Sequence, residues 1–264
     1  MTPTRTHTPT RPKPLSWFQR QRSNLLLAPP FLLSTGIFGT LALIASLWDK
    51  SGRMQHRIAR RWARACIFFS GSRLQVVGLE NIPAETAVFA GNHTSYMDTP
   101  VVFASLPFQF RILAKKELWG LPFIGWYLDR SGQIPIDTGN PRATLSSFAA
   151  GVHTLRNGLN VFVFPEGGRT ETGELQPFLN GAAFLAIRAQ VPLVPIALIG
   201  VHDLLPPHTA HFYPSRAPLK LVFGPPIPTA HHSIRESEAL TLELQRAIAT
   251  LIWQDSENTA RNGL

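Results

Sequence analysis

A histidine and an aspartate five residues apart are the first residues in this sequence that could do chemistry together. His93 and Asp98 follow the apolar run 87–90, within the segment Gly-Asn-His-Thr-Ser-Tyr-Met-Asp at 91–98. A neutral imidazole can take a proton from a hydroxyl near pH 7, and a carboxylate on its other nitrogen orients the ring. The pair needs no serine or cysteine if the substrate supplies the hydroxyl. Taken alone, this spacing also fits a structural histidine beside a helix-capping aspartate.

A second segment places a carboxylate and a guanidinium directly after a predicted strand. The run 161–164 ends at Pro165, and Glu166, Gly167 and Arg169 follow. Glycine lets the backbone approach a ligand closely, and arginine binds phosphate through paired, charge-assisted hydrogen bonds. The segment favours a phosphate site, with a plain strand-to-loop turn as the alternative.

A third segment carries three cations around a short strand, 111–114. Arg111, Lys115 and Lys116 lie there, ahead of an apolar stretch at 118–128. Attraction of phosphate is the functional interpretation, and a solvated charge run is the alternative. The apolar stretch could line an acyl-chain groove or belong to the core.

The elements that must position these residues alternate in type along residues 71–264. Short apolar, β-branched runs predict strands at 74–77, 87–90, 111–114, 133–136, 161–164, 193–199 and 219–223. Helical patterns occur at 98–106, 116–129, 141–157, 178–190 and 234–253. This alternation predicts an α/β domain whose central sheet is mostly parallel and flanked by helices.

The charge of the chain is concentrated near its N-terminus. The 264 residues carry a net charge of +9 and are 44% apolar, and their 16% charged share is below the usual value of about 25%. Residues 1–64 hold 11 Lys and Arg and one acid, whereas the remainder holds 14 and 15. Such a basic end suits an anionic membrane or a nucleic acid. The single cysteine, Cys66, excludes a disulfide within the chain.

An apolar segment separates the N-terminal cations and favours the membrane over nucleic acid. Residues 25–48 contain no charge, which predicts a membrane anchor, with a signal peptide or a buried core helix as the alternatives. Pro29 and Pro30 are expected to break any helix there, so 31–48 suits a shallow or re-entrant helix better than a clean span.

The next segment, 51–70, reads as a basic amphipathic helix. Met54, Ile58, Trp62 and Cys66 recur every four residues among arginines. This pattern suits a helix in the membrane interface, or one packed on the domain. We therefore predict a disordered basic tail at 1–24, a membrane-anchoring helical hairpin at 25–70 and a catalytic domain at 71–264.

Four motifs, in order, resemble those of the glycerolipid acyltransferases, which include the lysophosphatidic acid (1-acylglycerol-3-phosphate) acyltransferases. The resemblance covers roughly residues 70–225. The matching residues are Asn92-His93-x4-Asp98, then Lys115-x-Glu117-Leu118 with Pro122 and Gly125, then Phe164-Pro165-Glu166-Gly167-x-Arg169, and Val191-Pro192-x-Val194-Pro195.

The resemblance implies a role for each matching residue. His93 would be the general base on an acceptor hydroxyl, with Asp98 orienting it, and backbone N–H groups after His93 would bind the oxyanion. Arg169, Lys115 and Arg111 would bind the acceptor phosphate, in a pocket shaped by Glu166 and Gly167.

The resemblance also implies the partners and the location. The acceptor would be a lysophospholipid in the membrane, and acyl-CoA or acyl carrier protein would be the co-substrate, with no metal or other cofactor. Residues 25–70 would hold the enzyme at the cytoplasmic face of the cell membrane.

Three departures from the family pattern put the acceptor headgroup in question. Gly168 replaces the usual Thr or Ser, Leu179 stands where a lysine is frequent, and Thr138 where an arginine is common. Another lysolipid, such as a lyso-ornithine lipid, is therefore an alternative acceptor. A non-catalytic membrane-binding module is the alternative to an enzyme.

Overall fold

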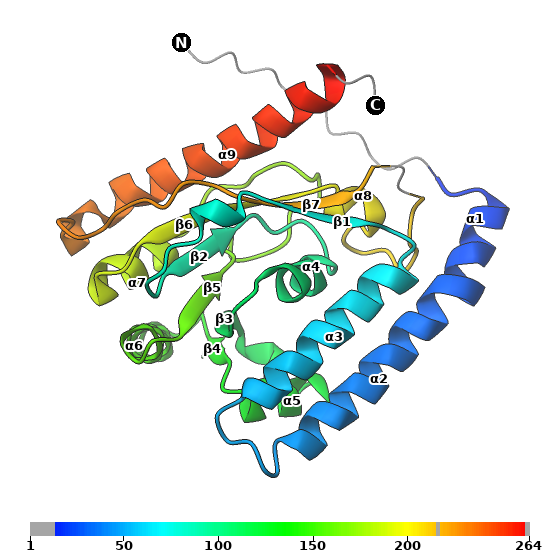
Figure 1. Ribbon diagram of the computed structural model, residues 1–264, viewed down its shortest axis with the longest axis horizontal. Coiled ribbons are helices and arrows are strands. Elements are labelled where there is room, and N and C mark those ends of the chain that lie inside the picture. The colour runs from blue at the N-terminus through cyan, green and yellow to red at the C-terminus, as the bar shows by residue number, and fades with distance from the viewer. Residues whose placement is uncertain (1–13, 215–216, 262–264) are drawn as a thin grey trace.

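The computed structural model describes residues 14–214 and 217–261 (Figure 1). Within these ranges a seven-stranded sheet has the order β1-β7-β6-β2-β5-β3-β4. Neighbouring strands are parallel except for β6 and β7. The predicted α/β fold with a mostly parallel sheet is thus confirmed. The strands are β1 (Leu74–Val77), β2 (Val88–Gly91), β3 (Phe110–Lys115), β4 (Ile134–Ile136), β5 (Asn160–Val163), β6 (Leu193–Ile199) and β7 (Leu219–Phe223).

Helices cover both faces of the sheet, as Figure 1 shows. Because side chains alternate along a strand, each central strand sends residues into two cores. Phe89 and Phe162 belong to the core beneath α3 (Arg53–Phe69) and α4 (Asp98–Ser105). Val88 and Val161 belong to the opposite core. That core is covered by α6 (Pro141–Arg156), α7 (Gly181–Ala189) and α9 (Ser237–Arg261).

Short elements complete the domain around the strand ends. They are η2 (Leu79–Asn81), η3 (Lys116–Gly120), α5 (Ile124–Arg130), α8 (Val201–Leu204) and η4 (Ile234–Glu236). Because β2, β3 and β5 are parallel, the loops at their C-terminal ends meet at one edge of the sheet. The motifs that follow these strands are thereby brought together.

One helical segment of 29 residues, Trp17–Ala45, precedes the domain and is long and apolar enough to cross a membrane. It consists of α1 (Trp17–Gln21), η1 (Arg22–Leu27) and α2 (Ala28–Ala45). Residues 17–24 are helical where we expected a disordered tail, because Ser16 and Gln19 form a capping box. Residues 1–13 of the expected tail lie outside the described residues.

The prediction that Pro29 and Pro30 break this helix is wrong. They occupy the first turn of α2, where proline is tolerated. The preceding turns of η1 are wider, and the Ala28 N–H donates to the Ser23 carbonyl, five residues back. This change of hydrogen-bond register lets the helix continue through two residues that have no N–H.

Helix α3 forms a hairpin with α2 and also packs on the domain. Its buried residues are Gln55, His56, Ala59, Ala63, Cys66 and Ile67. The Trp62 indole N–H donates to the Thr35 hydroxyl of α2 at 3.0 Å. Met54, which begins the predicted apolar side of this helix, is exposed. One side of α3 therefore packs on the domain, as one of our two interpretations expected, and its place relative to a membrane stays a prediction.

Candidate active site

The loop between β2 and α4 presents the histidine and aspartate as a hydrogen-bonded pair. His93 Nδ1 lies 2.8 Å from Asp98 Oδ2. Asp98 is the first residue of α4 and is fully buried, whereas the His93 side chain is 15% exposed. The tight turn between β2 and α4 thus folds the five-residue spacing into direct contact. The structure brings together the two residues that the sequence predicted to act as one unit.

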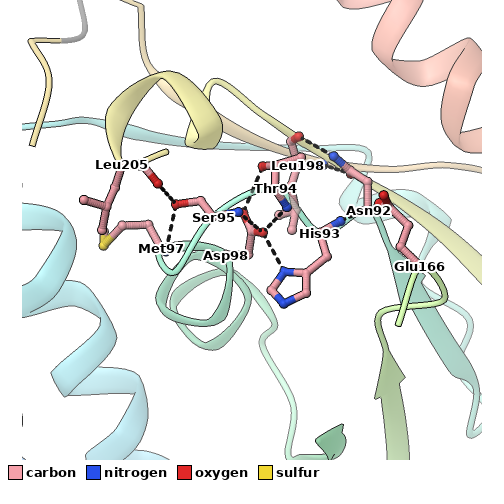
Figure 2. Close-up of polar contacts among 9 residues, drawn as sticks. All are labelled: Asn92, His93, Thr94, Ser95, Met97, Asp98, Glu166, Leu198 and Leu205. Atoms are coloured by element: carbon pink, nitrogen blue, oxygen red, sulfur yellow. Dashed lines mark hydrogen bonds and ion pairs between the residues drawn. The ribbon is translucent and has the colours of Figure 1, made fainter. Parts of the chain in front are cut away.

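The surroundings of Asp98 decide which nitrogen of His93 is free. Asp98 Oδ2 also accepts hydrogen bonds from the backbone N–H groups of Thr94 and Ser95, at 2.6 and 2.7 Å. A carboxylate that accepts from every neighbour leaves Nδ1 of His93 as the protonated, donating nitrogen. No described residue hydrogen-bonds Nε2, which points away from Asp98 in Figure 2. Nε2 is therefore positioned to act as a base.

The same contacts occupy some of the N–H groups that we expected to bind the oxyanion. The N–H groups of Thr94 and Ser95 are the first two after His93, and both are occupied by Asp98. The N–H of Met97 donates to the Ser95 hydroxyl at 3.0 Å. These three groups hold the loop, and the expectation that N–H groups after His93 bind the oxyanion stays a prediction. Their role is to fix the carboxylate that orients His93.

Two polar anchors tie this loop to strand β6 and to the end of α8. The Asn92 side chain donates to the Leu198 carbonyl at 3.0 Å and accepts from the Leu198 N–H at 2.7 Å, on strand β6 (Figure 2). The Ser95 hydroxyl donates to the Leu205 carbonyl at 2.7 Å. Asn92 could be singled out because it belongs to the motif around His93. No pattern in the sequence pointed to Ser95, and its partner lies 110 residues away.

The imidazole of His93 stacks on the ring of Phe164. Their ring centroids are 3.9 Å apart and their planes differ by 13°. Phe164 directly follows β5, the neighbour of β2 in the sheet. The stack restricts rotation of the imidazole, which complements the hydrogen bond from Nδ1.

Glu166 joins the loop after β5 to the loop after β2. Its Oε1 accepts from the His93 backbone N–H at 2.7 Å, and its Oε2 accepts from the Gln176 N–H at 3.0 Å. Burial raises the pKa of this carboxyl to about 7. Each oxygen accepts a backbone hydrogen bond, so Glu166 holds the two loops in place. This contact fits its expected part in shaping the pocket, and direct binding of substrate by Glu166 stays a prediction.

Gly167 makes the turn that aims the following residues. Its φ of 69° is in the left-handed region, which favours glycine. A side chain there would also lie 2.8 Å from Leu179 Cδ1. Leu179 thus packs over this turn and remains 55% exposed. It stands at the position where the family pattern often has a lysine. The apolar side chain of Leu179 therefore covers the turn at Gly167, and this position provides no positive charge.

Two of the three predicted phosphate-binding cations meet beside this turn. Lys115 ends β3, and its Nζ lies 3.9 Å from the position that a Cβ on Gly168 would occupy. Arg169 is the next residue and is exposed. In the described part of the chain, neither cation forms an ion pair with a carboxylate. Both charges are available to an anion near His93.

The expectation that Arg111 joins this site is wrong. Arg111 lies near the start of β3, and Lys115 lies four residues later, which is about 13 Å along a strand. The Arg111 side chain is buried, and its Nη2 donates to the Ser51 carbonyl at 3.1 Å. It therefore supports the turn between α2 and α3, at the opposite end of the strand from the active-site loops.

The candidate site has no constellation suited to a metal. Among residues 14–214 and 217–261, no three His, Cys, Asp or Glu side chains are grouped as ligands. The arrangement can instead deprotonate a hydroxyl at His93 Nε2 while cations hold an anionic part of the same molecule.

Comparisons with known proteins agree with this arrangement. A family model described as Acyltransferase matches residues 73–199. The chloroplastic 1-acyl-sn-glycerol-3-phosphate acyltransferase BAT2 of Brassica napus is 32% identical over 61% of this chain, which spans only 47% of that relative. The alpha 1-acyl-sn-glycerol-3-phosphate acyltransferase of Bos taurus is 30% identical over 74% of this chain and 68% of the relative.

A solved structure shares the fold. It is the 1-acyl-sn-glycerophosphate (LPA) acyltransferase PlsC from Thermotoga maritima, with a TM-score of 0.71 and 23% identity, covering 86% of this chain and 95% of that one. The motif residues, the fold and the similarity to the bovine enzyme together lead to one conclusion. This chain belongs to the 1-acyl-sn-glycerol-3-phosphate acyltransferase family.

Proposed function

We propose that this protein transfers a fatty acyl group from a thioester to the sn-2 hydroxyl of 1-acylglycerol-3-phosphate. The donor is acyl-CoA or acyl carrier protein. The observation that carries the proposal is the His93–Asp98 pair beside Lys115 and Arg169. Within the described residues, Nε2 of His93 makes no hydrogen bond and neither cation pairs with a carboxylate. A base and a phosphate site next to each other suit a substrate that carries both a hydroxyl and a phosphate. The names of the relatives support this choice of acceptor.

The reaction is a direct transfer at the thioester carbonyl. Nε2 of His93 removes the hydroxyl proton as the hydroxyl oxygen attacks the carbonyl carbon. The carbon–sulfur bond then breaks, and the leaving thiolate takes the proton from the imidazolium. Asp98 stabilises the positive charge on His93 between these two proton transfers. No acyl-enzyme is formed, because the acceptor itself supplies the nucleophile.

We further propose that the N-terminal hairpin places the enzyme on the cytoplasmic face of the cell membrane. Leu25, Leu26, Leu32 and Leu33 are each at least 65% exposed on the helix Trp17–Ala45. Phe123, which is 46% exposed, lies beside α2 at Gly39, so the apolar face extends onto the domain. Exposed apolar surfaces of this kind mark contacts with membranes or other proteins, and the length of this helix favours the membrane. Both thioester donors are cytoplasmic, which favours that face.

Basic residues of α3 would add attraction to anionic headgroups. Arg53, Arg57, Arg61 and Arg64 are exposed at helical spacing. Each cation near such a surface contributes about 1 kcal/mol. We expect binding to vesicles containing anionic lipid to weaken when all four are changed to Gln. The charge-matched control replaces four exposed arginines of α6, α7 and α9 on the other face of the sheet: Arg142, Arg156, Arg188 and Arg246. Equal binding of wild type and α3 variant would contradict the electrostatic part of the proposal.

Transfer of a labelled acyl chain by detergent-solubilised protein tests the activity. The assay uses both thioester donors and a panel of lysolipid acceptors, with His93→Gln as the blank. We expect product from lysophosphatidic acid, and an increase in its KM in Arg169→Ala. Product only from another lysolipid, such as a lyso-ornithine lipid, would show that Leu179 marks a change of headgroup. Absence of product with every acceptor from folded protein would favour the non-catalytic membrane module.

A further inference from the structure

An aromatic side chain within the catalytic loop lies against the candidate phosphate-binding arginine. The guanidinium carbon of Arg169 is 3.8 Å from the centroid of the Tyr96 ring. Tyr96 lies between His93 and Asp98 but contributes nothing to their hydrogen bonds, and it is 49% exposed. Neither the activity nor the packing of the core accounts for a tyrosine at this place.

The backbones that carry the two side chains are fixed against each other. The residues on either side of Tyr96 are tied by the Ser95 hydroxyl, which donates to Leu205 O and accepts from Met97 N–H. The residue after Arg169 is Thr170, which is buried and donates its N–H to the His93 carbonyl at 3.0 Å. The stack therefore joins two restrained loops and is not a chance contact of two long side chains.

We propose that Tyr96 is a positioning residue for the acceptor phosphate. Its ring supports one face of the Arg169 guanidinium, and the N–H groups at the edge of the guanidinium remain directed at the substrate. A guanidinium donates only in its own plane, so stacking on an aromatic face leaves all its donors free, unlike pairing with a carboxylate. This inference rests on the proposed function, because it assigns to Arg169 a phosphate ligand.

The size of the effect follows from the exposure of the pair. Losing an exposed cation–π contact changes an equilibrium constant by about 2- to 5-fold. Loss of the ring should therefore raise the KM for the acceptor by about 2- to 5-fold. The value of kcat and its pH profile, which depend on His93, should stay as in the wild type, and so should the KM for the thioester donor.

The experiment compares Tyr96→Leu, which removes the ring, with Tyr96→Phe, which keeps the ring face and removes only the hydroxyl. We expect the raised acceptor KM in Tyr96→Leu and rescue in Tyr96→Phe. In the Arg169→Ala background, Tyr96→Leu should have no further effect on the acceptor KM, because its partner is absent. Thermal unfolding of each variant shows that the protein is folded.

A second readout does not depend on turnover. The side-chain Nε–Hε signal of Arg169 should carry a ring-current shift in nuclear magnetic resonance spectra, lost in Tyr96→Leu and kept in Tyr96→Phe. An unchanged acceptor KM in Tyr96→Leu, a loss of kcat in place of a KM effect, or an additive effect with Arg169→Ala would overturn the inference. Failure of the wild type to acylate lysophosphatidic acid, or any phosphate-bearing lysolipid, would instead refute the proposed function and this inference with it.

Discussion

Replacing Asp98 by Asn tests how the catalytic pair works. Asp98 Oδ2 accepts from His93 Nδ1 and from two backbone N–H groups, and an amide oxygen at the same position can accept from all three. The substitution therefore removes the negative charge while keeping the hydrogen bonds. We expect the fold and the acceptor KM to be retained, and kcat to fall.

The size of the fall follows from the geometry. Hydrogen-bonded groups 2.8 Å apart place the two charge centres close together. At a separation of about 4 Å and an effective dielectric constant of about 20, two unit charges interact by about 4 kcal/mol. Because each factor of ten in rate corresponds to about 1.4 kcal/mol, loss of this interaction with the imidazolium lowers kcat about 1,000-fold.

The assay is the rate of labelled acyl transfer at saturating acceptor and donor, for wild type, Asp98→Asn, His93→Gln and the double variant. Asp98 acts through His93, so the double variant should be no slower than His93→Gln alone. Thermal unfolding provides the control for folding. The reasoning would be refuted by an Asp98→Asn protein that keeps more than a tenth of the wild-type kcat, or by losses that multiply in the double variant.

Three further predictions concern the surroundings of the site. Burial raises the pKa of Glu166 from 4.5 to about 7. Its protonation therefore stabilises the fold fully below pH 4.5, and this contribution is lost as the pH rises through 7. The melting temperature measured against pH should lose this dependence in Glu166→Gln. Burial lowers the pKa of His56 from 6.5 to about 4. The neutral imidazole therefore contributes to the stability of the fold above pH 6.5, and this contribution is lost as the pH falls through 4. His56→Phe should remove this loss at acid pH, and a plot of melting temperature against pH identical to that of the wild type would contradict the prediction. Arg111→Met should leave the acceptor KM unchanged while Arg169→Ala raises it, because Arg111 contacts the α2–α3 turn; an equal rise in both variants would restore Arg111 to the site.

The positions of the strands were readable from the sequence because each is a short apolar run bounded by turn residues. Residues 74–77, 193–199 and 219–223 were predicted with the observed bounds of β1, β6 and β7. Their order in the sheet was not readable, since β1 pairs with β7 across more than half of the chain and β7 runs against β6. The hydrophobic pattern of a strand indicates which of its faces are buried, but it does not indicate which other strand pairs with it in the sheet.

The N-terminal hairpin shows where pattern alone misleads. Helix α3 is amphipathic whether it lies on a membrane or on a protein, and only its contacts with α2 and α4 show that its buried stripe runs through Ala59, Ala63 and Cys66. Likewise, Pro29 and Pro30 predict a break in the helix if every turn before them is assumed to be an ordinary α-helical turn. The wider turn of η1 before them is a local adjustment that their residue types do not encode.

For the active site, the sequence by itself determined the chemistry available: a histidine and an aspartate at a spacing that one turn can close, and cations at the ends of two predicted strands. It could not separate Arg111 from Lys115, because both border the same apolar run. Tertiary structure decided this, since a strand carries its two ends about 13 Å apart and only the C-terminal end meets the loops of β2 and β5. It also turned Glu166 into a link between loops and set Tyr96 under Arg169, because contacts between residues distant in sequence exist only once the sheet has brought its strand ends together.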